Sequence, residues 1–360
     1  MIISIDNFKF QNLIAEEFLE LPQRWDGKDF YKTVNDLFDE YINILTKHIS
    51  KRDVNIVRTI CNNLLKCIDN YHKGFPNAAF DKMSDVMKKL NADPLKIYAK
   101  SGYSNEFDII DRLKLFRARN VQQNINYERK DIFHTPYNLR SKVATCRYSI
   151  SGFPSLYLGT SLELCCEESK ISSFNDLTIA SLFKLQRNMF NNDNLMINVI
   201  ELGIKPSDFI PRDDSYDQIL AGKERRRLLD EISLDDPIIM GKYLYWYPLI
   251  AACSFIRVNK SDQFASEYII PQLLMQWVRS QVDENKLVGI RYFSCASNRA
   301  SELGFNYIFP VSGKDGVDKP YYCNVLRRAF KLTKPKYIHE YESVRDCENA
   351  MKKDNNYNEI

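Results

Sequence analysis

Residues 146–168 read CRYSISGFPSLYLGTSLELCCEE, and this stretch decides how the larger, C-terminal part of the chain is interpreted. The runs at 143–150 and 155–159 are rich in the apolar and β-branched residues of strands. Gly152 and Pro154 lie between them and are typical of a short turn. We therefore expect two neighbouring, paired strands.

A helix is predicted after the second strand, near residues 161–170. The TSLE sequence at 160–163 has the S/T-x-x-E pattern of a helix start, and the positive end of such a helix is a favourable place for an anion. Arg147 would add a cation if its strand faces a cleft. Glu167 and Glu168 lie about 100° apart on a helix, so at most one of them points back to the sheet.

Each of these side chains also has an ordinary structural interpretation. An arginine on a strand is usually solvated or ion-paired, a tyrosine such as Tyr157 in an apolar strand is usually core, and a helical glutamate is usually surface. The pattern alone leaves open whether Arg147, Tyr157 and a glutamate converge on one ligand.

Length and composition indicate a globular protein. With 360 residues, the chain can form two domains or one large domain with an attached module. Hydrophobic residues make up 44% and charged residues 27%, and 50 Lys+Arg against 47 Asp+Glu leave a formal net charge of +3. This balance gives no reason to expect a nucleic-acid partner.

Targeting and metal signals are not evident in the sequence. No apolar run reaches the roughly 18–20 residues of a membrane span, and the first residues do not resemble a secretory signal. Nine cysteines, an odd number without a CxxC pair, favour a reducing cytoplasm, so we expect a cytoplasmic protein. The four histidines are scattered, so we expect no metal site.

The first part of the chain has helical periodicity. Apolar residues recur every three or four positions in 29–49 and 54–72, and a third helix is expected at 79–90. We predict a helical N-terminal domain over 1–105, with packing or assembly as its simplest role.

Short strands and helices are mixed in the remainder, which predicts an α+β fold with a mixed or antiparallel β core and flanking helices. The predicted domain spans 106–345, and a polar tail at 346–360 is expected to fray. Further strands are expected at 114–120, 195–202, 287–294 and 306–311, and further helices near 222–232, 243–257 and 265–282.

The spacing within the opening stretch resembles the RES-domain family, named for its Arg, Glu and Ser. In that family an Arg is followed ten residues later by a Tyr and eleven after that by a Glu. Arg147, Tyr157 and Glu168 have these intervals (157 − 147 = 10; 168 − 157 = 11), with a G-x-P turn between the first two. The same spacing selects Glu168 over Glu167.

Other blocks of the family follow in the same order, so the resemblance covers about 110–312. One departure is an insert around 169–257 that is longer than in compact members. The blocks are LFRAR with Arg117, FHTP (133–136), SEYIIPQLLMQWVRS (266–280), GIRYFS (289–294) with Ser294, and GFNYIFP (304–310).

The resemblance implies a fold like the ADP-ribosyltransferases and NAD⁺ as the substrate, with no bound cofactor. The implied activity is cleavage of the nicotinamide–ribose bond by phosphorolysis or hydrolysis. Inorganic phosphate is then a co-substrate of the phosphorolytic reaction. Members include toxins of toxin–antitoxin pairs, so we expect an NAD⁺-depleting toxin or anti-phage effector with an inhibitory antitoxin or an activating partner.

Residue roles follow from the same resemblance, and the chemistry suits them. Glu168 would stabilise the oxocarbenium-like ribose, and Tyr157 would stack on the nicotinamide. Arg117 and Arg147 would hold the diphosphate, and either could hold phosphate. Ser294 would donate a hydrogen bond to a phosphate or the carboxamide, or orient Glu168.

Alternatives stay open. A protein ADP-ribosyltransferase would use the same site, and a non-catalytic binding module would keep only the pocket. A ribonuclease is less favoured, because no R-x₄₋₆-H pattern occurs in the helical front. The helical N-terminal domain is also a place for homo-oligomerisation, and no membrane partner is expected.

Overall fold

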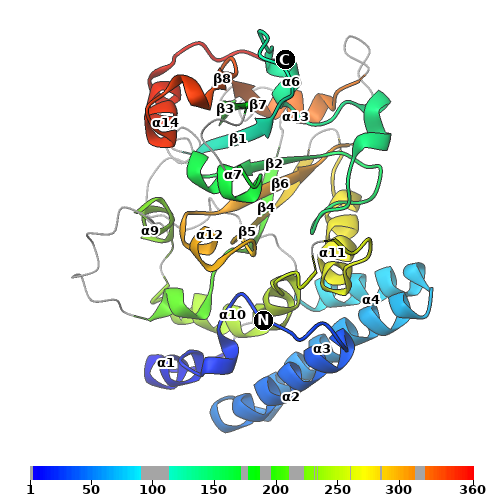
Figure 1. Ribbon diagram of the computed structural model, residues 1–360. Coiled ribbons are helices and arrows are strands. Elements are labelled where there is room, and N and C mark those ends of the chain that lie inside the picture. Colours follow the sequence, from blue (N-terminus) through cyan, green and yellow to red (C-terminus); the bar gives the residue numbers. More distant parts are fainter. Residues whose placement is uncertain are drawn as a thin grey trace.

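A computed structural model confirms the expected α+β fold, a helical N-terminal region followed by a mixed, mostly antiparallel sheet with flanking helices (Figure 1). The predicted boundary near residue 105 lies outside the residues that the structure describes. These are 3–90, 113–171, 177–186, 196–210, 223–230, 232, 234–259, 261–283, 286–312 and 321–360.

The helices expected from periodicity are present in the N-terminal region. The Asp29 and Ser50 side chains accept hydrogen bonds from the backbone N–H groups of Lys32 and Asp53, which caps the second and third helices. Gly74, with φ +82°, ends the third helix in a conformation that favours glycine. The elements are α1 (Asn7–Ile14), η1 (Glu17–Leu19), α2 (Phe30–His48), α3 (Lys51–His72) and α4 (Pro76–Lys89).

Two helices from the C-terminal part pack against this region. They are α10 (Pro237–Cys253) and α11 (Ile269–Ser280), which follows the short η5 (Ser266–Tyr268). Figure 1 shows both between the blue and cyan helices and the sheet. One hydrophobic cluster therefore runs from α1–α4 through α10 and α11 to the sheet.

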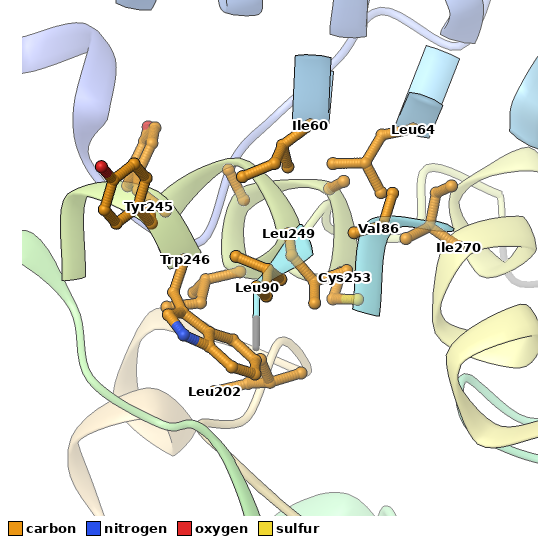
Figure 2. Close-up of a cluster of buried hydrophobic side chains, with 14 of the residues drawn as sticks. Ile60, Leu64, Val86, Leu90, Leu202, Tyr245, Trp246, Leu249, Cys253 and Ile270 are labelled. Carbon is orange, nitrogen blue, oxygen red and sulfur yellow. The ribbon is translucent and has the colours of Figure 1, made fainter. Parts of the chain in front are cut away.

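Helix α10 is apolar on all sides because it is surrounded by other elements. Figure 2 shows Leu249 and Cys253 of α10 beside Ile60 and Leu64 of α3, with Trp246 facing the sheet. The helix begins earlier and ends earlier than the predicted 243–257. Neither it nor any other described helix combines the length and apolar character needed to cross a bilayer.

The described strands form one sheet in the order β4-β5-β6-β2-β1-β3-β7, with β8 also paired to β3. Only β4 and β5 pair in parallel; the other pairs are antiparallel. The strands are β1 (Lys114–Asn120), β2 (Ser155–Gly159), β3 (Thr178–Leu185), β4 (Met196–Leu202), β5 (Lys286–Tyr292), β6 (Asn306–Pro310), β7 (Phe330–Leu332) and β8 (Lys336–Tyr337).

Shorter helical elements flank this sheet. They are α6 (Arg129–Ile132), η2 (Tyr137–Lys142), α7 (Leu162–Glu168), η3 (Pro206–Phe209), α9 (Lys223–Asp230), α12 (Asn298–Glu302), α13 (Asn324–Ala329), η6 (Ile338–Glu340) and α14 (Val344–Lys353).

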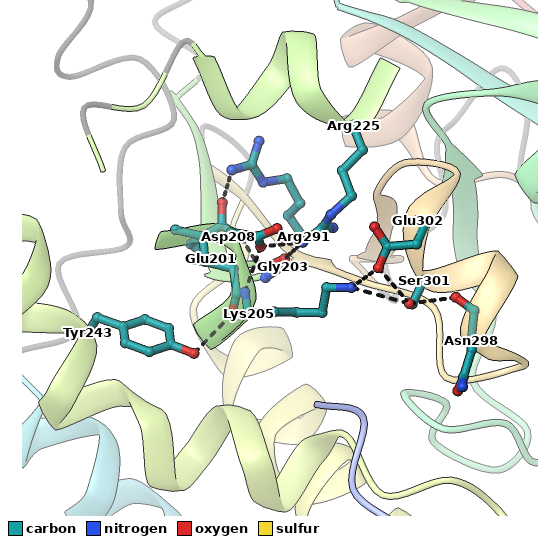
Figure 3. A network of polar contacts seen from close by, with 11 residues as sticks. Glu201, Gly203, Lys205, Asp208, Arg225, Tyr243, Arg291, Asn298, Ser301 and Glu302 are labelled. Atoms are coloured by element: carbon teal, nitrogen blue, oxygen red, sulfur yellow. Dashed lines mark hydrogen bonds and ion pairs between the residues drawn. The ribbon is translucent and has the colours of Figure 1, made fainter. Parts of the chain in front are cut away.

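A buried network of charged side chains connects β4 and β5, the parallel strands at one edge of the sheet, with η3 and α9 (Figure 3). Arg291 of β5 pairs with Glu201 of β4, and Arg225 of α9 pairs with Asp208 of η3. The guanidiniums of Arg225 and Arg291 both lie over the Phe305 ring, at 4.5 and 4.4 Å from its centroid. These carboxylates and guanidiniums compensate each other, so the network is a structural element of the edge.

The predicted strand at 143–150 is wrong. Residues 143–149 are irregular, and only Ile150 forms a bridge, to Phe153 across the turn that Gly152 makes with φ +70°. The Cys146 N–H donates its hydrogen bond to the Ser149 hydroxyl and not to a neighbouring strand. The expected pairing of this segment with β2 is also wrong, because β2 lies between β1 and β6.

Two further features depart from the expectations. Strand β3 was not predicted, although it pairs with β1, β7 and β8. The polar tail does not fray: Ser343 caps α14, which buries Cys347 and Met351 completely, and Asn358 bridges Leu332. The apolar face of α14 covers the side of the sheet near β3.

Candidate functional site

A pocket of about 820 Å³ opens where β1, β2 and α7 meet the segment before α11 and the residues at and after the end of β5. Its volume lies within the usual range for small-molecule sites. Four of the five predicted site residues line it: Arg117, Arg147, Tyr157 and Glu168. The structure thus brings together side chains from positions up to 51 residues apart (168 − 117 = 51).

Glu168 is the last residue of α7 and is exposed toward the pocket. Its carboxylate accepts a 2.6 Å hydrogen bond from the side-chain amide of Asn306, a residue that is itself 5% exposed. The neighbouring Glu167 forms an ion pair with Arg299, 3.4 Å between Nη1 and Oε1. The two glutamates therefore have different partners: Glu167 shares the exposed Arg299 with Glu163, and Glu168 is held by the uncharged amide of Asn306.

The helix start is capped differently from the prediction. Ser161, not Thr160, accepts from the Leu164 N–H, and the Leu162 N–H donates to the Glu348 carboxylate at 2.7 Å. The Thr160 hydroxyl instead accepts from the Phe305 N–H. The N-terminus of α7 is therefore occupied by a carboxylate of α14 and does not offer the expected anion site.

Arg117 reaches the pocket from β1. It donates from Nη1 to the Tyr157 carbonyl at 3.3 Å, and no carboxylate among the described residues pairs with it. Burial, together with the charge of Arg119, lowers the pKa of Arg117 to about 10. The group still carries its charge at neutral pH, so an anionic ligand would provide the missing counter-charge.

Arg147 lies in the irregular segment and not on a strand, yet it is firmly held. Its Nη1 and Nη2 donate to the Cys253 and Phe255 carbonyls at 2.9 and 2.8 Å. The guanidinium centre lies 5.1 Å from the centroid of the Tyr268 ring. Main-chain carbonyls after α10 therefore fix the direction of this cation, and its charge is not cancelled by a described carboxylate.

Tyr157 lies on β2 with its hydroxyl shielded from solvent, and that hydroxyl has no hydrogen-bond partner among the described residues. Burial, with smaller contributions from Cys146, Tyr268 and Glu168, raises the pKa of Tyr157 well above its ordinary value. The phenol therefore stays protonated at neutral pH.

Ser294 is not brought to the pocket lining. It is fully buried after β5, and its hydroxyl accepts from the Ala296 N–H at 3.1 Å. The three residues that follow it, 295–297, do line the pocket. The described contacts of Ser294 support this lining segment, and they include no hydrogen bond to Glu168.

Several lining residues were not predicted as site residues. Asn306 and Tyr268 occur within the GFNYIFP and SEYIIPQLLMQWVRS blocks, where their side-chain direction could not be read from spacing. Lys170 and Arg257 add two further cations to the lining. The described lining thus combines four cationic side chains with two carboxylates, Glu167, which contacts Arg299, and Glu168, which contacts Asn306.

No group of three or more His, Cys, Asp or Glu side chains among the described residues is arranged to hold a metal ion.

One curated protein provides a comparison along most of the chain. "Putative toxin YopC" of Bacillus subtilis (strain 168) is 28% identical over 343 residues, which cover 91% of this chain and 70% of that protein. No family model and no solved structure matches the chain.

Proposed function

We propose that this protein is a toxin that cleaves the nicotinamide–ribose bond of NAD⁺ and depletes the cellular NAD⁺ pool. The toxin role is supported by the similarity to a protein named as a toxin, which spans 91% of the chain. The reaction is supported by the RES-like spacing of Arg147, Tyr157 and Glu168 and by their positions around one pocket.

The observation that carries the proposal is the pair of Glu168 and Asn306 at the edge of a cationic pocket. Cleavage of the glycosidic bond develops positive charge on the ribose, and a fixed carboxylate beside that sugar lowers the barrier. An amide fixes the position of the carboxylate and leaves its negative charge in place, whereas an arginine would cancel that charge.

The other lining residues suit the remaining parts of NAD⁺. Arg117 and Arg147 lack carboxylate partners among the described residues and match the two negative charges of the diphosphate. Tyr157 lines the pocket, and its ring would stack on the nicotinamide. Ser294 acts by holding the lining residues 295–297.

In the proposed reaction the C–N bond breaks and its electron pair leaves with nicotinamide, which becomes neutral. The nucleophile is an oxygen of phosphate or water, which forms the new bond to the ribose carbon. Hydrolysis releases a proton, which Glu168 accepts; phosphorolysis yields ADP-ribose 1″-phosphate. The cationic lining favours phosphate as an attacking anion.

The test is incubation of purified protein with NAD⁺, with and without phosphate, followed by product identification by mass spectrometry. Nicotinamide with ADP-ribose 1″-phosphate identifies phosphorolysis, and nicotinamide with ADP-ribose identifies hydrolysis. Transfer of ADP-ribose to added lysate proteins identifies a protein ADP-ribosyltransferase. Unchanged NAD⁺ under every condition, with folded protein freed of any inhibitory partner, excludes the proposal.

The physiological setting is proposed separately. An enzyme of this kind requires restraint, so we propose a neutralising antitoxin or an activating trigger, in a toxin–antitoxin or anti-phage system in the cytoplasm. Induced expression should stop growth and lower cellular NAD⁺, and Glu168→Gln should do neither. If growth stops while cellular NAD⁺ stays constant, the proposed toxin role is retained and the proposed NAD⁺ cleavage is rejected.

A further inference from the structure

A loop that joins α10 to η5 brings a third arginine to the pocket. The loop is described at residues 254–259 and 261–265, and we call it the α10–η5 loop. Ile256 and Arg257 of this loop line the pocket. The Arg257 guanidinium centre lies 5.4 Å from the centroid of the Tyr268 ring, the same ring that Arg147 approaches at 5.1 Å.

The two guanidinium centres therefore lie no more than 10.5 Å apart (5.4 + 5.1 = 10.5). Arg257 donates from Nε to the Asn259 carbonyl at 3.0 Å and from Nη2 to the Asp262 carbonyl. Neither arginine has a carboxylate partner in the part of the chain that the structure describes. Both guanidiniums approach the same ring without a counter-charge, and an anion bound between them would supply one.

Each guanidinium retains donors for such an anion. An arginine has five N–H donors, and the contacts above use two nitrogens of Arg257 and two of Arg147. Both groups are also fixed in direction by main-chain carbonyls, which lowers the entropy cost of ligand binding. The site is thus built for a phosphate or diphosphate group.

The N-terminal helical region holds the loop in place at several points. The Ile256 N–H donates to the Gln23 carbonyl at 2.9 Å, and the buried Phe255 ring packs edge-to-face on Phe30 at 5.1 Å. Further along, Phe264 stacks on Tyr71 of α3 with ring centroids 6.2 Å apart and an interplanar angle of 9°.

We propose that Arg257 binds a phosphate group of the substrate together with Arg147, and that contacts with the N-terminal helices hold Arg257 in its binding position. The helical region then controls the affinity of the pocket without touching the ligand. This inference rests on the proposed function for the identity of the substrate, because the pocket itself specifies an anion.

Binding of ADP-ribose and of pyrophosphate to the purified full-length chain tests the proposal by titration calorimetry. Arg257→Gln should weaken both affinities at least tenfold, because it removes a charge-assisted hydrogen bond. Arg58→Gln, which removes an exposed arginine of α3, is the matched control and should leave both affinities unchanged.

The control by the helical region is tested with Phe264→Ala. Phe264 is 53% exposed, so its loss should leave the melting temperature within a few degrees, yet ADP-ribose binding should weaken severalfold as the loop loosens. Phe75→Ala removes another exposed ring, at the start of α4, and should have no effect on binding. Equal affinities for these two variants would refute the coupling.

The outcomes also separate this inference from the proposed function. If pyrophosphate binds and Arg257→Gln abolishes its binding while NAD⁺ is not cleaved, the anion site stands and the NAD⁺ reaction fails. If the unmodified chain binds neither probe, or if Arg257→Gln binds both as well as the unmodified chain, the assignment of Arg257 is wrong.

Discussion

The side-chain amide of Asn306 donates a 2.6 Å hydrogen bond to the Glu168 carboxylate, which joins the start of β6 to the end of α7 across 138 positions of sequence. This contact distinguishes Glu168 from Glu167, whose carboxylate pairs with Arg299. The choice of Glu168 over Glu167 as the catalytic residue remains a prediction.

Glu168→Gln should lower NAD⁺ cleavage by a factor of about 10³ or more, because the neutral amide cannot stabilise a developing positive charge. Circular dichroism and the melting temperature should stay unchanged, since the side chain is exposed. Glu167→Gln is the matched control and should retain most of the activity. A larger loss for Glu167→Gln would show that the neighbouring carboxylate does the chemistry.

Asn306→Asp should move the acid limb of the kcat/KM profile to higher pH. A second carboxylate next to Glu168 raises the pKa of the pair, so a higher pH is needed to ionise Glu168. Asn306→Ala should lower kcat by about 10–100-fold at all pH values without that displacement, because the carboxylate loses its orientation but gains no charged neighbour. Identical pH profiles for both variants would contradict a positioning role.

His134 should make stability depend on pH between about 5 and 7. The ring is 1% exposed, and desolvation by burial lowers its pKa to about 4, while its Nε2 accepts from the Cys323 N–H at 2.9 Å. The unfolded chain binds a proton near the ordinary value of 6.5 and the folded chain does not, so stability is complete above pH 6.5 and falls as the pH decreases toward 4.

This linkage corresponds to a loss of about 2 kcal/mol in the free energy of unfolding between pH 7 and pH 5. Urea denaturation at the two pH values measures it. His134→Gln should be less stable at pH 7 and should lose most of this pH dependence, because the amide does not titrate. An unchanged dependence in the variant would assign it to other groups.

Arg291→Met should destabilise the fold by about 3–5 kcal/mol, because it leaves the Glu201 carboxylate buried without its counter-charge. The matched control is Lys73→Met, which removes an exposed ion pair with Asp69 and should cost less than about 1 kcal/mol. Equal unfolding midpoints for the two variants in urea would show that the buried pair contributes no more than a surface pair.

The parts of the fold that sequence predicts best are those with a clear local period. The apolar stripe of α2, the bounds of β1 at 114–120 and the helix that ends at Glu168 are all confirmed. The stripe of α2 records the face that this helix buries, whereas β1 buries Leu115 and Phe116 on opposite faces and was predicted from its strand-forming residues.

The site could be predicted only in part, because its geometry depends on contacts between distant segments. Arg147 looked like a strand residue, but its position is set by the Cys253 and Phe255 carbonyls more than 100 positions later. Asn306 and Arg257 belong to elements whose local pattern contains no sign of a pocket. Spacing from a known family identifies residue types, while the supporting contacts need the folded chain.

The position of α10 has a consequence for synthesis of the chain on the ribosome. Between Lys89, the last residue of α4, and Pro237, the first of α10, lie 148 steps of elongation (237 − 89 = 148), on the order of ten seconds or more. During this interval the apolar faces of α3 and α4 that later pack on α10 and α11 are not yet covered by these helices. A nascent chain that stops short of Phe255 also lacks at least one of the two carbonyl groups that hold Arg147. Because the pocket lining extends to Asn306, the pocket can assemble only after this residue has been synthesised.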